Sequence, residues 1–290
     1  MTITLADSAG FCFGVKRAVD TVYVLLEDKE RQVYTLGPII HNEQVVEDLK
    51  SKGVGVVSAP EDIAGEKAED ATLVIRSHGV SREVIDRIHE KQLEYEDATC
   101  PFVKKIHETV REYSSKAYVI IIIGSKDHPE VQGILGWTNG RGIVIETAEE
   151  AEHFSLDDGS EKICIVAQTT FNYKKFQELV EIISKKGYDI IAVNTICNAT
   201  STRQKEAEEL AACSDAMVVI GGRHSSNSRK LYEICKNQCE NTFFIQTVDD
   251  LKEIVLNSFT SLGITAGAST PNNIIQEVLE ACQKKVLQNY

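Results

Sequence analysis

The feature that most constrains the fold is a pattern that occurs three times along the 290-residue chain. In each copy, a short segment ending in small and polar residues is followed by a cysteine and then by a helix-like pattern. The three cysteines, Cys12, Cys100 and Cys197, lie 88 and 97 residues apart. A repeat of this length is too long for a solenoid and indicates three small domains of similar design.

Each copy also carries two polar loops, each at the end of an apolar segment. The first loop begins with glycine and reaches its polar position 28 or 29 residues after the cysteine, at His41, His128 and Ser225. The second loop follows the next apolar segment and holds His78, Thr169 and Ser269. Three positions per repeat, the cysteine and one in each polar loop, all lie at strand-to-helix junctions, and such a pattern is typical of a binding site.

Apolar runs without alternation, such as residues 119–123, are typical of parallel strands that helices bury on both faces. We therefore expect an α/β fold of three similar small domains, in a pseudo-threefold, trefoil-like arrangement around a central cleft. The expected domains are residues 14–98, 99–195 and 196–290, with an N-terminal strand in residues 1–13 joined to them. Ligands of such sheets bind at the carboxyl ends of the strands, so the cysteines and loops should gather in the cleft.

The expected elements follow the apolar periodicity. The expected strands are 3–6, 33–36, 53–57, 72–75, 118–123, 143–145, 163–166, 217–220, 243–245 and 263–265. The expected helices are one that begins just after Cys12 and 44–50, 81–92, 102–114, 129–137, 173–186, 201–212, 228–236 and 271–287.

Composition excludes several classes of function. With 42% apolar and 26% charged residues, the chain lies in the ordinary range of globular proteins. A net charge of −13 argues against a nucleic-acid partner, since phosphate backbones are bound by clustered Lys and Arg. The sequence has neither an apolar run of about 18 residues nor a basic and then apolar N-terminus, so we expect no membrane partner and a cytoplasmic location.

The chemistry expected of the three cysteines is metal ligation. Buried cysteine is often only a small hydrophobe, but one cysteine at the same position in each repeat is hard to explain by packing. Three thiolates without a CxxC pair do not suit a zinc ribbon, whereas they suit an iron–sulfur cluster. If only three thiolates bind a four-iron cube, one iron keeps an open position. We interpret the other cysteines as structural, including Cys235 and Cys239, which are one helical turn apart.

The polar loops suit an anion, because each ends where a helix begins and free N–H groups favour phosphate there. A lone histidine is usually structural, but histidines at equivalent junctions favour a binding site. Arg76 and Arg223 also lie in these loops, but their interpretation as solvated or structural charges is at least as well supported as a binding role. Glu130 follows a His-Pro pair and could supply protons, as could Glu43 at the matching position, although acidic residues are common at helix N-termini.

Eight motifs, in order, resemble those of the 4-hydroxy-3-methylbut-2-enyl diphosphate reductase (LytB/IspH) family over essentially the whole chain. They are AGFCFGV (9–15), GPIIHN (37–42), SHG (77–79), DATCP (97–101), HPEV (128–131), QTT (168–170), SSNS (225–228) and TAGAS (265–269).

The resemblance implies an oxidoreductase with one [4Fe-4S] cluster per subunit on Cys12, Cys100 and Cys197, one iron not being bound by cysteine. The reaction is a two-electron, two-proton reductive dehydroxylation to isopentenyl and dimethylallyl diphosphate, the last step of the non-mevalonate isoprenoid pathway. Electrons come from a donor such as ferredoxin or flavodoxin. Glu130 is the implied catalytic acid. The implied substrate-binding residues are His41, His78, His128, Thr169, Ser225, Ser226, Asn227 and Ser269.

Two alternatives stay open at this point. A cluster-dependent dehydratase would remove water without net reduction, so it would need no external electron donor. An iron–sulfur or zinc sensor on a three-domain scaffold would bind metal without turnover.

Overall fold

The computed structural model describes residues 1–63, 70–156, 162–256 and 258–287. The chain divides into two compact units. Unit 1 comprises Met1–Lys16, His41–Glu47 and Asn198–Tyr290, and unit 2 comprises Arg17–Ile40 and Asp48–Cys197. Each unit is described by itself below.

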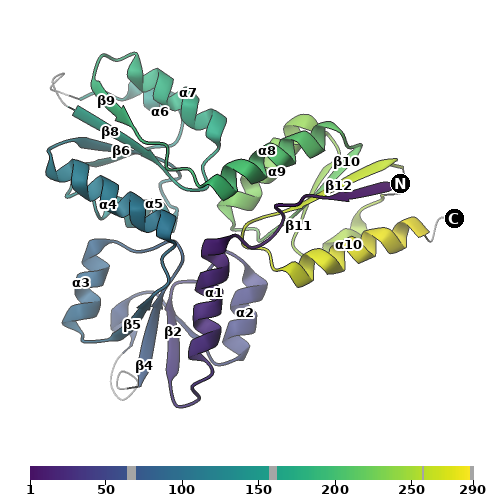
Figure 1. Ribbon diagram of the computed structural model, residues 1–290, viewed down its shortest axis with the longest axis horizontal. Coiled ribbons are helices and arrows are strands. Elements are labelled where there is room, and N and C mark those ends of the chain that lie inside the picture. The colour runs from purple at the N-terminus through teal and green to yellow at the C-terminus, as the bar shows by residue number, and fades with distance from the viewer. Residues whose placement is uncertain (64–69, 157–161, 257, 288–290) are drawn as a thin grey trace. The chain divides into compact units, whose positions relative to one another are not determined.

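The strands of the described chain form three parallel four-stranded sheets (Figure 1). The first sheet, in unit 2, has the order β3-β2-β4-β5, with β2 (Gln32–Leu36), β3 (Gly55–Val57), β4 (Ala71–Ile75) and β5 (Glu94–Asp97). The second, also in unit 2, has the order β7-β6-β8-β9, with β6 (Val119–Ile123), β7 (Gly142–Ile145), β8 (Lys162–Ala167) and β9 (Asp189–Ala192). The third, in unit 1, has the order β11-β10-β12-β1, with β1 (Thr2–Leu5), β10 (Ala216–Ile220), β11 (Thr242–Ile245) and β12 (Ser261–Ala266).

Helices follow most strands, as parallel connections require. The α-helices are α1 (Phe13–Leu25), α2 (Glu43–Ser51), α3 (Arg82–Glu90), α4 (Pro101–Ser115), α5 (Pro129–Leu135), α6 (Ala148–His153), α7 (Tyr173–Ser184), α8 (Asn198–Ala212), α9 (Ser226–Gln238) and α10 (Asn272–Leu287). Within the described ranges, short 3₁₀ helices span Pro60–Asp62 and Asp250–Glu253.

The second sheet shows why its central strands are apolar at every position. Ile121 and Ile123 of β6 pack into a cluster with α6 and α7, whereas Ile120 and Ile122 pack into another with α4 and α5. Both faces are therefore covered, and each fully buried isoleucine contributes about 1.5–3 kcal/mol through its burial. The third sheet is covered in the same way, by α10 on one face and by α8 and α9 on the other.

The N-terminal strand belongs to the third sheet. β1 pairs in parallel with β12, from Thr2 opposite Ser261 to Leu5 opposite Ile264. Figure 1 shows this purple strand beside the yellow β12. The pairing gives the third sheet the same four-stranded order as the other two, because β1, β5 and β9 are all edge strands beside β12, β4 and β8.

The expected α/β class with three similar small parts is confirmed by these sheets. The arrangement around a central cleft and the domain boundaries stay predictions. The sequence reading missed β5, β9 and α6. Both strands are only four residues long, and no position of EYED or DIIA is fully buried, because an edge strand has only one neighbour to cover it.

Candidate active site

The three repeat cysteines occupy the same position in their sheets. Each follows an edge strand and directly precedes a helix: α1, α4 or α8. Each backbone N–H donates to a carbonyl in the loop after the neighbouring strand: Cys12 to Ala268 at 3.1 Å, Cys100 to Ser77 at 2.9 Å and Cys197 to Thr169 at 3.0 Å. The same hydrogen bond therefore joins each cysteine to the second polar loop of its own sheet.

Burial separates these cysteines from the other five. Cys12, Cys100 and Cys197 are half-buried, whereas Cys213 is exposed and the remaining four are buried. Burial raises the pKa of the Cys164 and Cys235 thiols to about 12, so both are protonated at neutral pH. Since a metal ligand is a thiolate, the structure favours a packing role for these two.

Glu130 is the only buried carboxylate among the described residues, with 1% of its surface exposed. It lies at the N-terminus of α5, in unit 2, and its carboxylate accepts two hydrogen bonds from Thr169. The Thr169 N–H donates to Oε1 at 2.6 Å, and the Thr169 hydroxyl donates to Oε2 at 2.7 Å. The two residues thus form one buried pair that links the two polar loops of the second sheet.

His128 contacts the backbone of Glu130, the carboxylate of this pair. It is the N-cap residue of α5, and its Nδ1 accepts the backbone N–H of Glu130 at 3.2 Å. Since Nδ1 is the acceptor, the ring proton of the neutral imidazole resides on Nε2. The ring of His78, from the first sheet, meets the His128 ring edge-on with centroids 5.2 Å apart. Unit 2 therefore brings together His78, His128, Glu130 and Thr169.

Unit 1 assembles a second group at the N-terminus of α9. Ser225 is the N-cap residue of that helix and accepts the Ser228 N–H at 3.3 Å. The Ser269 hydroxyl lies 3.4 Å from the Ser225 hydroxyl oxygen and donates to the His41 carbonyl at 3.1 Å. His41 of the first repeat and Ser225 and Ser269 of the third, all selected by sequence spacing, are therefore neighbours.

Asn227 is the most informative residue of this group. Its side chain is 5% exposed, yet neither Oδ1 nor Nδ2 has a hydrogen-bond partner among the described residues. A buried amide without partners destabilises a protein by about 1–3 kcal/mol. An arrangement of this kind is retained where a bound molecule completes the hydrogen bonds.

The sequence reading did not find the contact that fixes the His41 segment. Glu43 accepts a hydrogen bond from the Gln246 amide at 2.7 Å, and His224 Nε2 lies 3.9 Å from its other oxygen. Gly222 makes the close approach possible, because a Cβ there would lie 2.7 Å from the His41 carbonyl oxygen. Glu43 is therefore bonded to the loops of the third sheet, unlike Glu130, which contacts Thr169.

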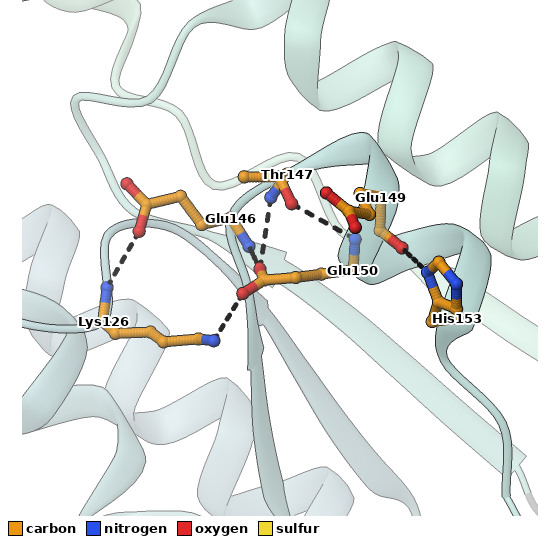
Figure 2. A network of polar contacts seen from close by, with 6 residues as sticks. All are labelled: Lys126, Glu146, Thr147, Glu149, Glu150 and His153. Atoms are coloured by element: carbon orange, nitrogen blue, oxygen red, sulfur yellow. Dashed lines mark hydrogen bonds and ion pairs between the residues drawn. The ribbon is translucent and has the colours of Figure 1, made fainter.

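A polar network beyond the carboxyl ends of β6 and β7 joins Lys126, in the loop that leads to His128, to the start of α6 (Figure 2). The Lys126 ammonium pairs with Glu150 at 2.5 Å, and the pKa of the Glu150 carboxyl is lowered chiefly by this hydrogen bond. Glu150 and Thr147 also form a capping box at the start of α6. His153, at the end of this helix, bonds the Glu149 carbonyl at 2.8 Å, a contact within its own helix.

His107 is a buried core histidine. Its ring stacks on Trp137 with centroids 5.4 Å apart, and burial lowers its pKa to about 4. The ring also lies against Gly79, where a Cβ would meet His107 Cε1 at 2.8 Å. The arginines of the polar loops differ from each other: Arg76 is half-buried, and desolvation lowers its pKa, whereas Arg223 is exposed beside Asp250.

The site geometry defines a class of protein, a three-sheet α/β protein with a half-buried cysteine and two polar loops at each sheet. Residues 3–283 match the family described as LytB protein, and the chain belongs to this family. The resemblance inferred from the eight motifs is thereby confirmed. Among the described helices, none is long and apolar enough to cross a membrane.

Named relatives cover almost the whole chain. It is 44% identical over 281 residues to the 4-hydroxy-3-methylbut-2-enyl diphosphate reductase of Caldanaerobacter subterraneus subsp. tengcongensis, covering 97% of this chain and 96% of the relative. It is 46% identical over 279 residues to the reductase of the same name from Clostridioides difficile, covering 96% and 98%.

Two solved structures are similar as well. One is an (E)-4-hydroxy-3-methyl-but-2-enyl diphosphate reductase, described as the terminal enzyme of the non-mevalonate pathway, with 42% identity and a TM-score of 0.68 over 98% of this chain and all of that one. The other is the E-1-hydroxy-2-methyl-but-2-enyl-4-diphosphate reductase of Plasmodium falciparum, with 28% identity and a TM-score of 0.90 over 96% and 87%.

Proposed function

We propose that the chain is a 4-hydroxy-3-methylbut-2-enyl diphosphate reductase. The reaction adds two electrons and two protons to the allylic alcohol, breaks its C–O bond, releases the hydroxyl as water and yields isopentenyl or dimethylallyl diphosphate. Family membership and relatives of this name over 96–97% of the chain support the assignment. The observation that carries the chemistry is the buried Glu130 carboxylate bonded twice to Thr169.

The proposed cofactor is a [4Fe-4S] cluster on Cys12, Cys100 and Cys197, with one iron not bound by cysteine. The donor set fits this group: the three thiols are half-buried at equivalent positions, and the backbone N–H of each is already bonded. Thiolates are the usual ligands of iron–sulfur clusters. When bound, the cluster would supply the electrons and a Lewis-acidic iron with an open position.

The proposed diphosphate ligands use two kinds of donor. In unit 1, Ser225, Ser226, Asn227 and Ser269 lie at or near the N-terminus of α9, together with His41. The helix dipole and the first N–H groups favour an anion there, and the unpaired Asn227 amide offers two further donor hydrogens. His78 and His128 of unit 2 would add imidazole donors, since Nε2 carries the proton in His128.

The proposed proton path runs from Glu130 to Thr169. The Thr169 hydroxyl donates to Glu130, and a proton held on Glu130 would reverse this hydrogen bond. Thr169 would then donate its own proton to the leaving hydroxyl of the substrate. A general acid must hold a proton before it gives one up, so the proposed path requires a protonated Glu130 when substrate is bound.

The test is anaerobic purification, analysis of iron and sulfide, and an assay with reduced dye and the hydroxylated isoprenoid diphosphate. We expect about four irons per chain and dye oxidation that depends on this substrate. Zinc, or a cluster without turnover, would favour a sensor. Product formed without dye oxidation would indicate a dehydratase. Ferredoxin and flavodoxin are the proposed physiological donors, and the cytoplasm is the proposed location.

A further inference from the structure

A buried arginine holds the loop that leads to Cys12. Arg203 of α8 is 4% exposed and lies in unit 1 with that loop. Its Nε and Nη2 donate to the Ser8 carbonyl at 2.9 and 2.6 Å, and Nη2 also donates to the Gly10 carbonyl at 2.8 Å. One planar guanidinium thus spans two carbonyls within four residues of the cysteine.

The same helix also binds the donors of this loop. Glu206, one turn after Arg203, accepts the backbone N–H groups of Asp7 at 2.6 Å and of Ser8 at 3.0 Å. It also accepts the Ser8 hydroxyl. Gly10 has a φ of +101°, a left-handed conformation that few other residues adopt. The loop shape is therefore determined mainly by side chains that lie almost 200 residues away in sequence.

A second arginine holds the loop that leads to Cys100. Arg17 of α1 belongs to unit 2, as does that loop. Its Nη2 donates to the Thr99 carbonyl at 2.6 Å and, more weakly, to the Asp97 carbonyl at 3.4 Å. Thr99 is the residue directly before the cysteine, and its own N–H is bonded to the Asp97 carboxylate at 2.9 Å.

The two arginines occupy related positions relative to the cysteines. Arg17 lies in the helix that begins after Cys12 and holds the loop before Cys100. Arg203 lies in the helix that begins after Cys197 and holds the loop before Cys12. Each of these two helices starts at one cysteine and binds the backbone that presents another.

The loop before Cys197 is held differently. The Thr195 hydroxyl donates to the Ala167 carbonyl at 2.6 Å and accepts the Ala167 N–H at 2.8 Å. This loop is therefore bonded directly to its own sheet through a side chain of the loop, and it gives an internal comparison for the two arginine-held loops.

We propose that Arg17 and Arg203 are positioning residues, each holding one cysteine thiol in the geometry required for cluster binding. The proposal rests on the proposed cluster. Ligands on loops need support from neighbouring side chains to keep a productive geometry. Arginine suits this role at Arg203 because its flat fork reaches two carbonyls, whereas lysine offers a single cation without that fork.

The experiment measures alkylation of each cysteine in the metal-free full chain under anaerobic conditions, with iodoacetamide as the probe and mass spectrometry as the readout. In Arg203→Met, we expect alkylation of Cys12 at least tenfold faster and that of Cys100 within twofold of the unsubstituted chain. In Arg17→Met, we expect the reverse. Each variant is thus the control for the other, and Cys197 should be unchanged in both.

Two further variants test whether the guanidinium groups themselves cause the change in alkylation rate. Arg203→Lys should restore part of the Cys12 protection, because a cation can still bond one carbonyl. Arg82→Met removes an exposed arginine whose partner is Asp86, and it should change none of the three rates. After reconstitution with iron and sulfide, both methionine variants should release iron to a chelator at least fivefold faster than the unsubstituted chain.

The results separate the possible explanations. Equal acceleration at all three cysteines would indicate general destabilisation and would overturn the proposal, as would unchanged rates in both variants. If a methionine variant does not fold, the ratio of Cys12 to Cys100 rates in Arg203→Lys decides instead. Because alkylation is measured without metal or substrate, a failure of the proposed reductase activity would be seen separately.

Discussion

The buried contact between Glu130 and Thr169 allows one decisive substitution, Glu130→Gln. Glutamine keeps the size and shape of the side chain but removes its charge and replaces one acceptor oxygen with an NH₂ donor. It can still accept the Thr169 N–H, now at 2.6 Å from Oε1, but it cannot accept the Thr169 hydroxyl at Oε2. The hydroxyl would have to turn and become the acceptor.

The expected effects of Glu130→Gln on folding stability and on the rate of turnover differ in size. A hydrogen bond to a charged group contributes about 1.5–3 kcal/mol and a neutral one about 1 kcal/mol, so the weakened pair should cost about 1–2 kcal/mol. The lower desolvation of a neutral amide offsets part of this loss. A general acid contributes about 10²–10⁴-fold to the rate, equivalent to about 2.7–5.4 kcal/mol of barrier. Turnover should therefore fall much more than stability.

The assay is steady-state oxidation of reduced dye by anaerobically purified enzyme, with iron content measured on the same sample. We expect kcat of Glu130→Gln to fall by at least about 100-fold while KM changes by less than about threefold. Thr169→Ser keeps both the hydroxyl and the N–H and is the matched control, whereas Thr169→Val removes only the hydroxyl. If the two residues form one path, the Gln and Val losses should not add. Full turnover of Glu130→Gln with unchanged iron would refute the relay.

Three other predictions follow from the structure. Cys197→Ser should abolish stable cluster assembly, and iron analysis that shows an undiminished content would remove this cysteine from the proposed ligands. Asn227→Ala should weaken the binding of inorganic diphosphate about tenfold or more in calorimetry. It should raise the free energy of unfolding or leave it unchanged, since the amide has no described partner to lose and its burial without partners costs about 1–3 kcal/mol. His107 has its pKa lowered from 6.5 to about 4 by burial, so the unfolded chain binds this proton first as pH falls. The free energy of unfolding should therefore decrease by about 1.4 kcal/mol per pH unit from pH 6.5 towards 4, and urea unfolding of His107→Leu should lack this component.

Local patterns were sufficient for the elements that carry the site. The apolar run 119–123 predicted a strand covered on both faces, and the buried isoleucines of β6 confirm this reading. Spacing from each cysteine selected His41, Ser225 and Ser269, which are neighbours in unit 1. These inferences succeeded because a parallel strand, its loop and the following helix are consecutive in sequence, so their order and polarity can be read locally.

Edge strands were harder to predict from local sequence patterns. β5 is mostly charged, β9 is only four residues long, and both are only partly buried, so neither shows a periodic signal long enough to distinguish it from a loop. They become strands because a neighbouring strand, β4 or β8, supplies the hydrogen bonds. Pairing of this kind depends on tertiary structure rather than on the intrinsic preference of the segment.

By itself the sequence determined the three repeats, the α/β class, the family and the candidate cysteines and polar loops, because each depends on residues close together in the chain. Only the tertiary structure decided what holds those loops. The partners of Glu43 and of the Ser8 carbonyl lie 203 and 195 residues away, and no local periodicity relates them. A side chain on a helix surface becomes a positioning residue only when folding brings another loop to it.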